Sequence, residues 1–391
     1  MNAWAQFYTP QPAGHLLVDA MLTERAQAVV DIGVGPGQLL RAARARWQDA
    51  RLYAADIDPQ HVAAVRTHFP DAVCRHLDAL HVRLPAKLGL EEDQADVAVC
   101  NPPYLPAIDI PGVHDILRAV DLHKCVSAKR VTTEIAFIAQ NLRLLRPGGE
   151  LAVIVPDGLA THNHYADLRQ ALCECHGLHR VIQLPDRFFA KTEARTHIFY
   201  LRKQAGTANE IRLAGAMPDG GLTEDVTISP SLARTRLDYS FHSHVDARDS
   251  TVITLRDLGA EMMRGLFTHK DCLAGELPFF HTTDFKHFPN GRVVYPVRDD
   301  LPERWTAQLG DFLVPRVGAR CLHYAAMVTS GHPVMTDCVY RIRVAAQWRQ
   351  TVWKALSSVE GISWRQQAAH GVCARVLGKE MLLGFPVKVT A

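Results

Sequence analysis

The chain has 391 residues, of which 48% are hydrophobic and 21% charged, a composition that is typical of folded proteins and excludes an intrinsically disordered chain. Its 43 lysines and arginines balance 41 aspartates and glutamates, so the net charge of +2 does not by itself indicate a polyanionic partner. The balance is uneven, because residues 231–391 carry a net charge of +5 and the residues before them one of −3. A basic C-terminal part is compatible with nucleic-acid binding without requiring it.

The cysteines and the apolar runs exclude two further classes of protein. The nine cysteines are an odd number and none stands in Cys-x-x-Cys spacing, so the sequence predicts neither a disulfide framework nor a structural metal site. No apolar run approaches the ~20 residues that span a bilayer. The N-terminal segment MNAWAQFYTP lacks the basic and apolar regions of a signal peptide. We therefore expect a cytoplasmic protein with no membrane partner and no bound metal.

The first half of the chain alternates between apolar runs of strand length and segments with helical periodicity. In chain order, the expected strands are AVVDI, RLYAAD, AVCRHLD, ADVAVC, ELAVIVP, LHRVIQL and THIFYLRK. Strands that alternate with helices predict an α/β fold with a doubly wound, mostly parallel sheet, which binds ligands at the carboxyl ends of its strands.

The pattern changes after residue 203. The stretch QAGTANEIRLAGAMPDGG is rich in small and turn-forming residues, so we expect a linker in residues 204–249. From residue 250 to residue 391, short extended segments are separated by Gly, Pro and Asp, with one helical stretch near QWRQTVWKALSSVE. This part predicts a second, smaller domain of the mixed α+β class.

The segment VVDIGVGPG places Gly33, Gly35 and Gly37 directly after the first expected strand. Glycines at this point let the backbone turn sharply and let a ligand approach without a Cβ in the way. Their G-x-G-x-G spacing differs from the G-x-G-x-x-G of dinucleotide-binding proteins, which argues against a nicotinamide-dependent dehydrogenase. Asp56 ends the second expected strand, where its carboxylate can accept both hydroxyl protons of a ribose. These features predict a site for a nucleoside-containing cofactor, whereas Asp58 is expected to cap the next helix.

Asn101, Pro102, Pro103 and Tyr104 follow the expected strand ADVAVC without a gap. Two prolines at a strand end remove backbone donors and fix φ, so the preceding carbonyls point into the crevice as acceptors. The side-chain oxygen of Asn101 beside such a carbonyl gives two acceptors, which suit an NH₂ group with two protons to donate. Tyr104 offers a flat face on which a planar amide or base can stack. The motif therefore predicts a pocket for a planar amine.

With these motifs in this order, residues 4–203 resemble the amino-group DNA methyltransferases that use S-adenosylmethionine, in particular the N(6)-adenine branch and the modification subunits of type I restriction systems. The resemblance implies a Rossmann-like methyltransferase sheet of seven strands in residues 1–203. It implies S-adenosylmethionine as the cofactor, held by Tyr8, Thr9, Pro10, Asp31, Gly33, Gly35, Gly37, Asp56, Asp78 and Asn101. It also implies that Asn101, Pro102 and Tyr104 act on a flipped-out adenine. Phe189 corresponds to an aromatic residue that packs against the target base, and a core position is an equal alternative for it.

Residues 250–391 resemble one half of a type I specificity subunit, the target-recognition module. The matching segments are TLRDLGAEMMRG, LPFFHTTDF, LGDFLVPRVG and HGVCARVLGKEMLLGFPV. The resemblance implies double-stranded DNA with a specific target sequence as a partner, and either a homodimer or a partner subunit of a restriction system. Only one such half is visible, whereas separate specificity subunits usually carry two. Arg341, Arg343 and Arg349 suit DNA contact and a packed strand–helix junction equally.

The hypothesis that follows is a site-specific DNA methyltransferase, in a restriction–modification or related system, that methylates the exocyclic amine of adenine. Since the Asn-Pro-Pro-Tyr motif suits any planar NH₂ group, a methyltransferase of the same fold that acts on an RNA base or on a protein glutamine amide stays open. A non-catalytic DNA-recognition component is a second alternative. The intact glycine turn, Asp56 and the Asn101 motif argue against that alternative.

Overall fold

The computed structural model describes residues 9–106, 110–126, 131–186, 188–189, 195–204, 206, 209–217, 219–243, 252–275, 279–297, 301–318, 320–370 and 375–389. The chain divides into two compact units, residues 1–243 and residues 244–391, and we describe each by itself. Among the described residues, no helix is both long enough and apolar enough to cross a membrane.

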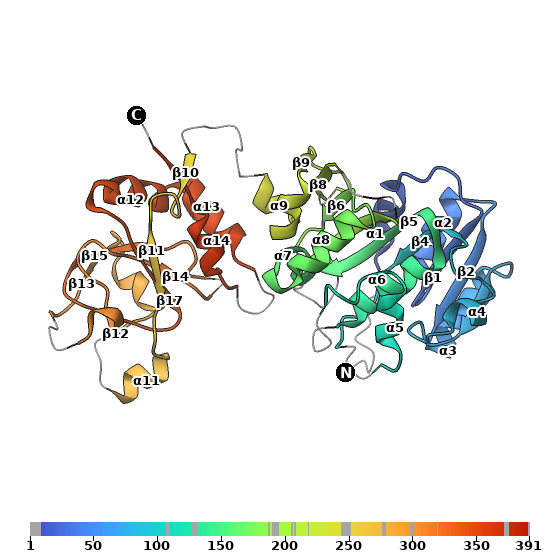
Figure 1. The fold of residues 1–391 in the computed structure, drawn as a ribbon, viewed down its shortest axis with the longest axis horizontal. Coiled ribbons are helices and arrows are strands. Elements are labelled where there is room, and N and C mark those ends of the chain that lie inside the picture. Colours follow the sequence, from blue (N-terminus) through green and yellow to red (C-terminus); the bar gives the residue numbers. More distant parts are fainter. Residues whose placement is uncertain are drawn as a thin grey trace. The chain divides into compact units, whose positions relative to one another are not determined.

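The first unit is built on a nine-stranded sheet with the strand order β3-β2-β1-β4-β5-β7-β6-β8-β9 (Figure 1). The strands are β1 (Ala28–Ile32), β2 (Arg51–Asp56), β3 (Val73–His76), β4 (Ala95–Cys100), β5 (Leu145–Pro156), β6 (Arg180–Gln183), β7 (Thr196–Arg202), β8 (Ile211–Gly215) and β9 (Val226–Ile228). Strands β1 to β5 pair in parallel, whereas β7 runs antiparallel to both β5 and β6. The mostly parallel α/β sheet confirms the predicted fold class, and it has two strands more than the seven expected.

Helices cover both faces of this sheet. They are α1 (Gln11–Asp19), α2 (Gln38–Arg46), α3 (Pro59–His68), α4 (Leu84–Leu88), α5 (Val113–Arg118), α6 (Thr133–Leu144), α7 (Asp157–Thr161), α8 (Ala166–Glu174), α9 (Pro230–Thr235) and α10 (Tyr239–His242), with the 3-10 turn η2 (Asn163–Tyr165) between α7 and α8. Alternate residues of a strand enter different cores: in β1, Val29 belongs to the core that includes residues of α1, α2 and α3, while Val30 belongs to the core that includes residues of α4, α5, α6 and α8. Because both faces are buried, the central strands read as continuous apolar runs.

The structure differs from the sequence prediction in residues 204–249. Instead of a linker, this range contributes β8 and β9 to the sheet edge, followed by α9 and α10, and the first unit extends to Ser243. β8 pairs in parallel with β6, and its residues Ile211 and Leu213 are fully buried in the core. β8 has only five residues and turn-forming residues on either side, so the sequence alone does not predict it as a strand.

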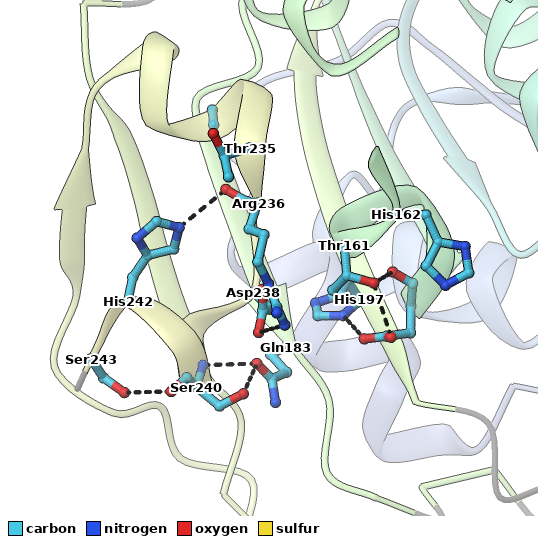
Figure 2. A network of polar contacts seen from close by, with 12 residues as sticks. Thr161, His162, Gln183, His197, Thr235, Arg236, Asp238, Ser240, His242 and Ser243 are labelled. Carbon is cyan, nitrogen blue, oxygen red and sulfur yellow. Dashed lines mark hydrogen bonds and ion pairs between the residues drawn. The ribbon is translucent and has the colours of Figure 1, made fainter. Parts of the chain in front are cut away.

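Polar contacts attach α10 and the end of α9 to the rest of the first unit (Figure 2). Arg236 and Asp238 form a two-point ion pair of 2.6 and 2.7 Å with both side chains at most 1% exposed, and His242 Nε2 lies 3.1 Å from the Arg236 carbonyl oxygen. The backbone amide and the hydroxyl of Ser240 both donate to Gln183 Oε1 of β6, at 2.9 and 3.1 Å. These contacts make the segment after β9 an integral part of the fold.

A second buried group in Figure 2 joins α7 to β7. Thr161 Oγ1 donates to a carboxylate oxygen of Asp157 at 3.1 Å, and His197 Nε2 lies 3.1 Å from the other oxygen. Burial alone would raise the pKa of Asp157, but the hydrogen bond and charge of His197 hold that pKa well below its usual range. Asp157 is therefore an ionised, fully partnered side chain at the end of β5.

The second unit contains a mixed five-stranded sheet with the order β11-β17-β14-β15-β13. Its strands are β11 (Glu261–Arg264), β13 (Arg292–Val294), β14 (Phe312–Pro315), β15 (Ala326–Ser330) and β17 (Val339–Arg343); shorter pairs are formed by β10 (Val252–Thr254) with β18 (Pro386–Lys388) and by β12 (Phe279–Phe280) with β16 (Val334–Met335). The helices are α11 (His269–Ala274), α12 (Arg349–Ser357), α13 (Val359–Ala368) and α14 (Lys379–Leu383), and the 3-10 turns are η3 (Asp284–His287), η4 (Glu303–Trp305) and η5 (Ala346–Trp348). This arrangement agrees with the predicted α+β class.

Two arginines of β17 that suited either DNA contact or packing are packed. Arg341 is 5% exposed and donates to the carbonyl oxygen of Thr306 at 3.1 Å. Arg343 donates two hydrogen bonds of 2.8 and 2.9 Å to Asp311 and a third of 2.6 Å to Glu303. Both guanidinium groups are hydrogen-bonded to groups of their own unit, so neither is available to contact a DNA phosphate.

Candidate active site

A cavity of about 330 Å³ opens at the carboxyl ends of β1, β2 and β4, next to the first turn of α6. Among the residues proposed from the sequence, those that line it are Thr9, Asp31, Gly33, Gly35, Asp56, Asp78, Asn101 and Pro102. This is the edge of a parallel sheet at which ligands bind in α/β folds, and the volume lies within the range of small-molecule sites. The two motifs that the sequence places 64 residues apart therefore share one cavity.

The glycine turn, residues 33–37, has a left-handed backbone at its three glycines. Gly33, Gly35 and Gly37 have φ values of +75°, +53° and +84°, which residues with a Cβ rarely adopt. The amide of Gly33 donates to the carbonyl of Ala55 at 2.8 Å, and the amide of Gly35 donates to Asp56 Oδ2 at 2.7 Å, so the turn is fastened to the end of β2. Gly37 does not line the cavity; it is the N-cap residue of α2.

Asp31 is a carboxylate with no partner in the part of the chain that the structure describes. It lies in β1, is 1% exposed and lines the cavity, and neither carboxylate oxygen has a hydrogen bond. Burial, and then the nearby charge of Asp56, hold the pKa of Asp31 well above its ordinary value. Buried carboxylates normally have partners, so this side chain is arranged to receive a cationic or hydrogen-bond-donating group from a ligand.

Asp56, the last residue of β2, also lines the cavity. Its carboxylate is 4% exposed and accepts from the amides of Gly35 and Asp58, the latter at 2.8 Å. His61 Nδ1 lies 3.4 Å from Asp56 Oδ1. These contacts fix the carboxylate at the rim of the glycine turn. As expected, Asp58 caps α3, since its side chain accepts from the Gln60 amide at 2.8 Å.

The Asn101 loop follows β4, which borders β1 on the side away from β2. The side-chain nitrogen of Asn101 donates to Thr9 Oγ1 at 3.0 Å, and the Tyr104 hydroxyl donates to Asn101 Oδ1 over 3.4 Å. The Asn101 amide is thus held at both ends. Thr9 is brought to this loop from the N-terminal segment, 92 residues away in sequence.

The family model of the N-6 DNA methylases matches residues 2–217, which is more than half of the chain. The chain belongs to the N-6 DNA methylase family. The matched range ends within two residues of β8, so it contains the complete cavity.

Curated relatives of this N-6 DNA methylase family member include methyltransferases of different names. It is 23% identical over 234 residues to the methylase subunit of the type I restriction enzyme EcoEI of Escherichia coli, a match that covers 55% of this chain and 46% of the relative. It is 27% identical over 179 residues to a release factor glutamine methyltransferase of Cereibacter sphaeroides, covering 45% of this chain and 62% of the relative. In both cases the chain spans less than two thirds of the relative's own length.

Among solved structures, the type IIG restriction endonuclease BpuSI is similar with a TM-score of 0.54 and 14% sequence identity, covering 100% of this chain and 59% of BpuSI. At this identity the similarity shows the fold alone.

Family membership implies S-adenosylmethionine as the methyl donor, and the cavity fits such a group. The unpartnered carboxylate of Asp31 suits the donor's amino group, and the Asp56 carboxylate suits hydroxyl groups. At Gly35, which lines the cavity, an added Cβ would meet no other atom within 4 Å, so the backbone itself borders open space. The other proposed cofactor residues lie differently. Asp78 lines the cavity but is exposed, Pro10 is the N-cap residue of α1, and Tyr8 lies outside the described residues.

Phe189 does not line the cavity. It is 3% exposed and lies in the core that α1, α2 and α3 form with the sheet, and its ring packs edge-on against Phe188 at a centroid distance of 5.7 Å. This is the core position that the sequence left as an alternative to stacking on a base. The sequence could not decide which of these two adjacent aromatic rings lies in the core, because either one can turn inward.

Thr133 is the residue of this site that sequence reasoning missed. As the first residue of α6, it donates its hydroxyl proton to the Pro103 carbonyl and accepts from the Leu105 amide at 2.9 Å, while its own amide donates to the Leu105 carbonyl at 2.7 Å. A loop with two prolines offers few backbone donors, so these three bonds hold it against the sheet. The only sequence signal was a threonine at a helix start, which is common in any fold.

Proposed function

We propose that this chain is an adenine-specific DNA methyltransferase that transfers a methyl group from S-adenosylmethionine to the exocyclic amine of a base in double-stranded DNA, within a restriction–modification or related system. The observation that carries the proposal is the shared cavity, in which the fixed amide of Asn101 lies beside the glycine turn and the unpartnered Asp31. Membership of the N-6 DNA methylase family supports the same reaction.

When bound, S-adenosylmethionine supplies a methyl group on a positively charged sulfur. In this proposal Asp31 accepts hydrogen bonds from the donor's amino group, which neutralises an otherwise isolated buried carboxylate. Asp56 accepts from the ribose hydroxyls, and the turn at Gly33 and Gly35 allows the backbone to approach the donor closely. Gly37 shapes the turn without touching the ligand.

The chain's own contribution to catalysis is to hold the target amine. An exocyclic amine of adenine is a weak nucleophile, because its lone pair is delocalised into the ring. Asn101 Oδ1 and the Pro102 carbonyl would accept its two protons, which localises the lone pair on nitrogen and directs it at the methyl group. Positioning supplies much of the acceleration, and the spare proton of the product can leave to water.

A base inside a duplex cannot enter this cavity, so the proposal requires extrusion of the target nucleotide. Tyr104, which neighbours Asn101 but does not itself line the cavity, would replace part of the stacking that the base loses. Phe189 is not assigned this role here, because it lies in the core. The smaller unit, in which 18 lysines and arginines outnumber 14 aspartates and glutamates in residues 244–391, would hold the phosphates and read the target sequence, and binding should weaken as salt rises.

A protein glutamine amide is the second candidate substrate. It is favoured by the similarity to a release factor glutamine methyltransferase and by the fact that an amide NH₂ presents the same two donors as adenine. A methyltransferase for glutamine would not require the charged second unit to bind DNA. Identification of the methylated product, adenine or glutamine, therefore distinguishes the two candidate substrates.

The proposal is tested by incubating the full chain with radiolabelled S-adenosylmethionine and unmethylated genomic DNA, followed by nucleoside analysis by mass spectrometry. We expect N6-methyladenine with the wild-type chain and at least a ~100-fold lower rate with Asn101→Ala, with cofactor affinity changed by no more than a few-fold. Asn163→Ala, an exposed asparagine outside the cavity, is the matched control.

Three results would contradict the proposal. They are methylated cytosine as the product, methyl transfer to a release factor glutamine instead of DNA, and full activity of Asn101→Ala.

A further inference from the structure

Helix α6 is a buried helix to which the proposed reaction assigns no step. All of its residues, from Thr133 to Leu144, are buried, and two of them, Thr133 and Phe137, also line the cavity. The helix carries polar side chains into this interior, and buried polar groups are retained where they have partners. The partners of Thr133 and Gln140 include backbone groups of segments that form the cavity.

The first residue of α6 holds the Asn101 loop. The Thr133 hydroxyl donates to the Pro103 carbonyl and accepts from the Leu105 amide at 2.9 Å. The Thr133 amide donates to the Leu105 carbonyl at 2.7 Å. A segment with two adjacent prolines has few backbone donors of its own, so these bonds to α6 determine where the loop lies.

Two further contacts lie along the same helix. The ring of Phe137 packs against the glycine turn, since a Cβ added to Gly33 would lie 3.0 Å from Cε1 of Phe137. Gln140 is 0% exposed, and its Nε2 donates to the carbonyl oxygens of Ala79 and His81, both at 3.0 Å. Ala79, which follows β3, lines the cavity as well. The helix therefore contacts three segments of the cavity that are far apart in the sequence.

Thr133, Phe137 and Gln140 are spaced i, i+4 and i+7, which places them on one face of the helix. We propose that this face of α6 is the positioning element of the site, in which Thr133 holds the loop for the target amine at a fixed distance from the cofactor side, held by Phe137 and Gln140. A displacement of about 1 Å between reacting groups can cost about 100-fold in rate, so a stiff, buried spacer matters. This proposal rests on the proposed function, which assigns the loop to the amine and the cavity to S-adenosylmethionine.

The two ends of this face should affect different steps. Thr133→Val keeps the volume of the side chain but removes the hydroxyl, so we expect about a tenfold lower single-turnover rate at saturating S-adenosylmethionine. Its Kd for the cofactor should stay within about twofold of wild type, and Thr133→Ser, which retains the hydroxyl, should recover most of the rate. Gln140→Met should instead raise the Kd about fivefold and lower the saturated rate by less than about threefold.

Thr161→Val is the matched control for the loss of a buried hydroxyl. Thr161 lies in the first unit and donates to the Asp157 carbonyl oxygen at 2.9 Å, but it does not line the cavity. This variant should lose stability without losing rate. A normal rate in Thr133→Val, or equal losses of rate and of cofactor affinity in Thr133→Val and Gln140→Met, would overturn the proposal. If Gln140→Met does not fold, the comparison of Thr133→Val with Thr133→Ser decides.

Hydrogen exchange of the free protein tests the attachment of the loop without cofactor or DNA. Residues 101–106 include three prolines, so backbone exchange there reports only Asn101, Tyr104 and Leu105. Thr133→Val should speed the exchange of the Leu105 amide about fivefold, and Thr133→Ser should not. Unchanged exchange in Thr133→Val would refute the role of α6.

Failure of the proposed function has a different signature. Wild type would then methylate no DNA, while the exchange result for Thr133→Val and the higher cofactor Kd of Gln140→Met would still be found. That combination would refute DNA methylation and leave the positioning by α6 intact.

Discussion

The hydroxyl oxygen of Thr9 accepts a 3.0 Å hydrogen bond from the side-chain nitrogen of Asn101. An amide carries its nitrogen and its oxygen on opposite sides, so this bond also decides where Oδ1 points, which is toward the Tyr104 hydroxyl. The sequence assigns Thr9 to the cofactor, and Thr9 does line the cavity. Its bond to Asn101 adds a different role, the orientation of the Asn101 amide.

Thr9→Val should therefore reduce kcat more than it reduces cofactor affinity. Valine keeps the volume but cannot accept from Asn101, and one such hydrogen bond is worth about 1 kcal/mol, or roughly fivefold to tenfold in rate. Thr9→Ser retains the acceptor and should recover most of the rate. Single-turnover methylation and calorimetric titration with S-adenosylmethionine measure the two effects. A variant that binds the cofactor poorly but transfers methyl groups at the normal rate would assign Thr9 to the cofactor alone.

Asp31→Asn should make the free protein more stable and its cofactor binding weaker. The wild-type carboxylate is buried without a partner, and replacing it with a neutral amide should raise the free energy of unfolding at pH 8 by about 1–3 kcal/mol. Under the proposed function, Asp31 accepts from the donor's amino group, so we expect at least a tenfold higher Kd for the variant. Urea unfolding and calorimetry check both effects. Asp49→Asn, at an exposed position after α2, serves as the control.

The sequence predicted the central strands from their burial, and it predicted the position of the cavity from the parallel arrangement of those strands. Strands β1, β2 and β4 and the second half of β5 are almost entirely buried, so each reads as an apolar run, and parallel strands bring the residues after β1, β2 and β4 to one edge. Asp58 was predicted as a helix cap because a short carboxylate before a proline has a local geometry that sequence alone determines.

The remaining features depend on contacts between distant residues. Thr133 acts on a loop about 30 residues earlier, and nothing local distinguishes it from other polar residues at a helix start. The inward turn of Phe189 is likewise decided by packing against α1, α2 and α3. β8 escaped detection because its flanks are typical of loops, and its pairing with β6 becomes visible only in the sheet.

Glu134, the second residue of α6, is 4% exposed and should give the protein a characteristic pH dependence of stability. Its pKa is raised by burial from 4.5 to about 7, so the folded state binds the proton more tightly than the unfolded chain does. The stability that this provides is complete below pH 4.5 and is lost as pH rises to about 7, by linkage an upper limit of about 3 kcal/mol. In Glu134→Gln this loss should disappear. Urea unfolding of both proteins at pH 5 and pH 8 measures the difference, and identical pH profiles would contradict it.

The boundary of the first unit predicts which shortened chains fold. A chain that ends at Lys203 would leave β6 without its partner β8. It would also leave Arg169, which is 1% exposed, without the carbonyl oxygens of Ala233, Arg234 and Thr235 to which it donates. We expect residues 1–203 to be insoluble or unfolded, and residues 1–243 to unfold cooperatively and bind S-adenosylmethionine. Circular dichroism and calorimetry distinguish the two chains. A well-folded 1–203 fragment would show that β8 to α10 are dispensable.

The ion pair between Arg236 and Asp238 should account for much of the attachment of α10 (Figure 2). Asp238→Asn leaves the Arg236 guanidinium buried without a countercharge, and breaking a buried pair in this way costs about 3–5 kcal/mol. Asp167→Asn is the matched control, because Asp167 pairs with Arg234 at 2.9 Å where both side chains are more than half exposed. Solvent screens that pair, so its loss should cost less than about 1 kcal/mol. Urea unfolding compares the two variants, and equal costs would mean that the buried pair contributes no more than a surface contact.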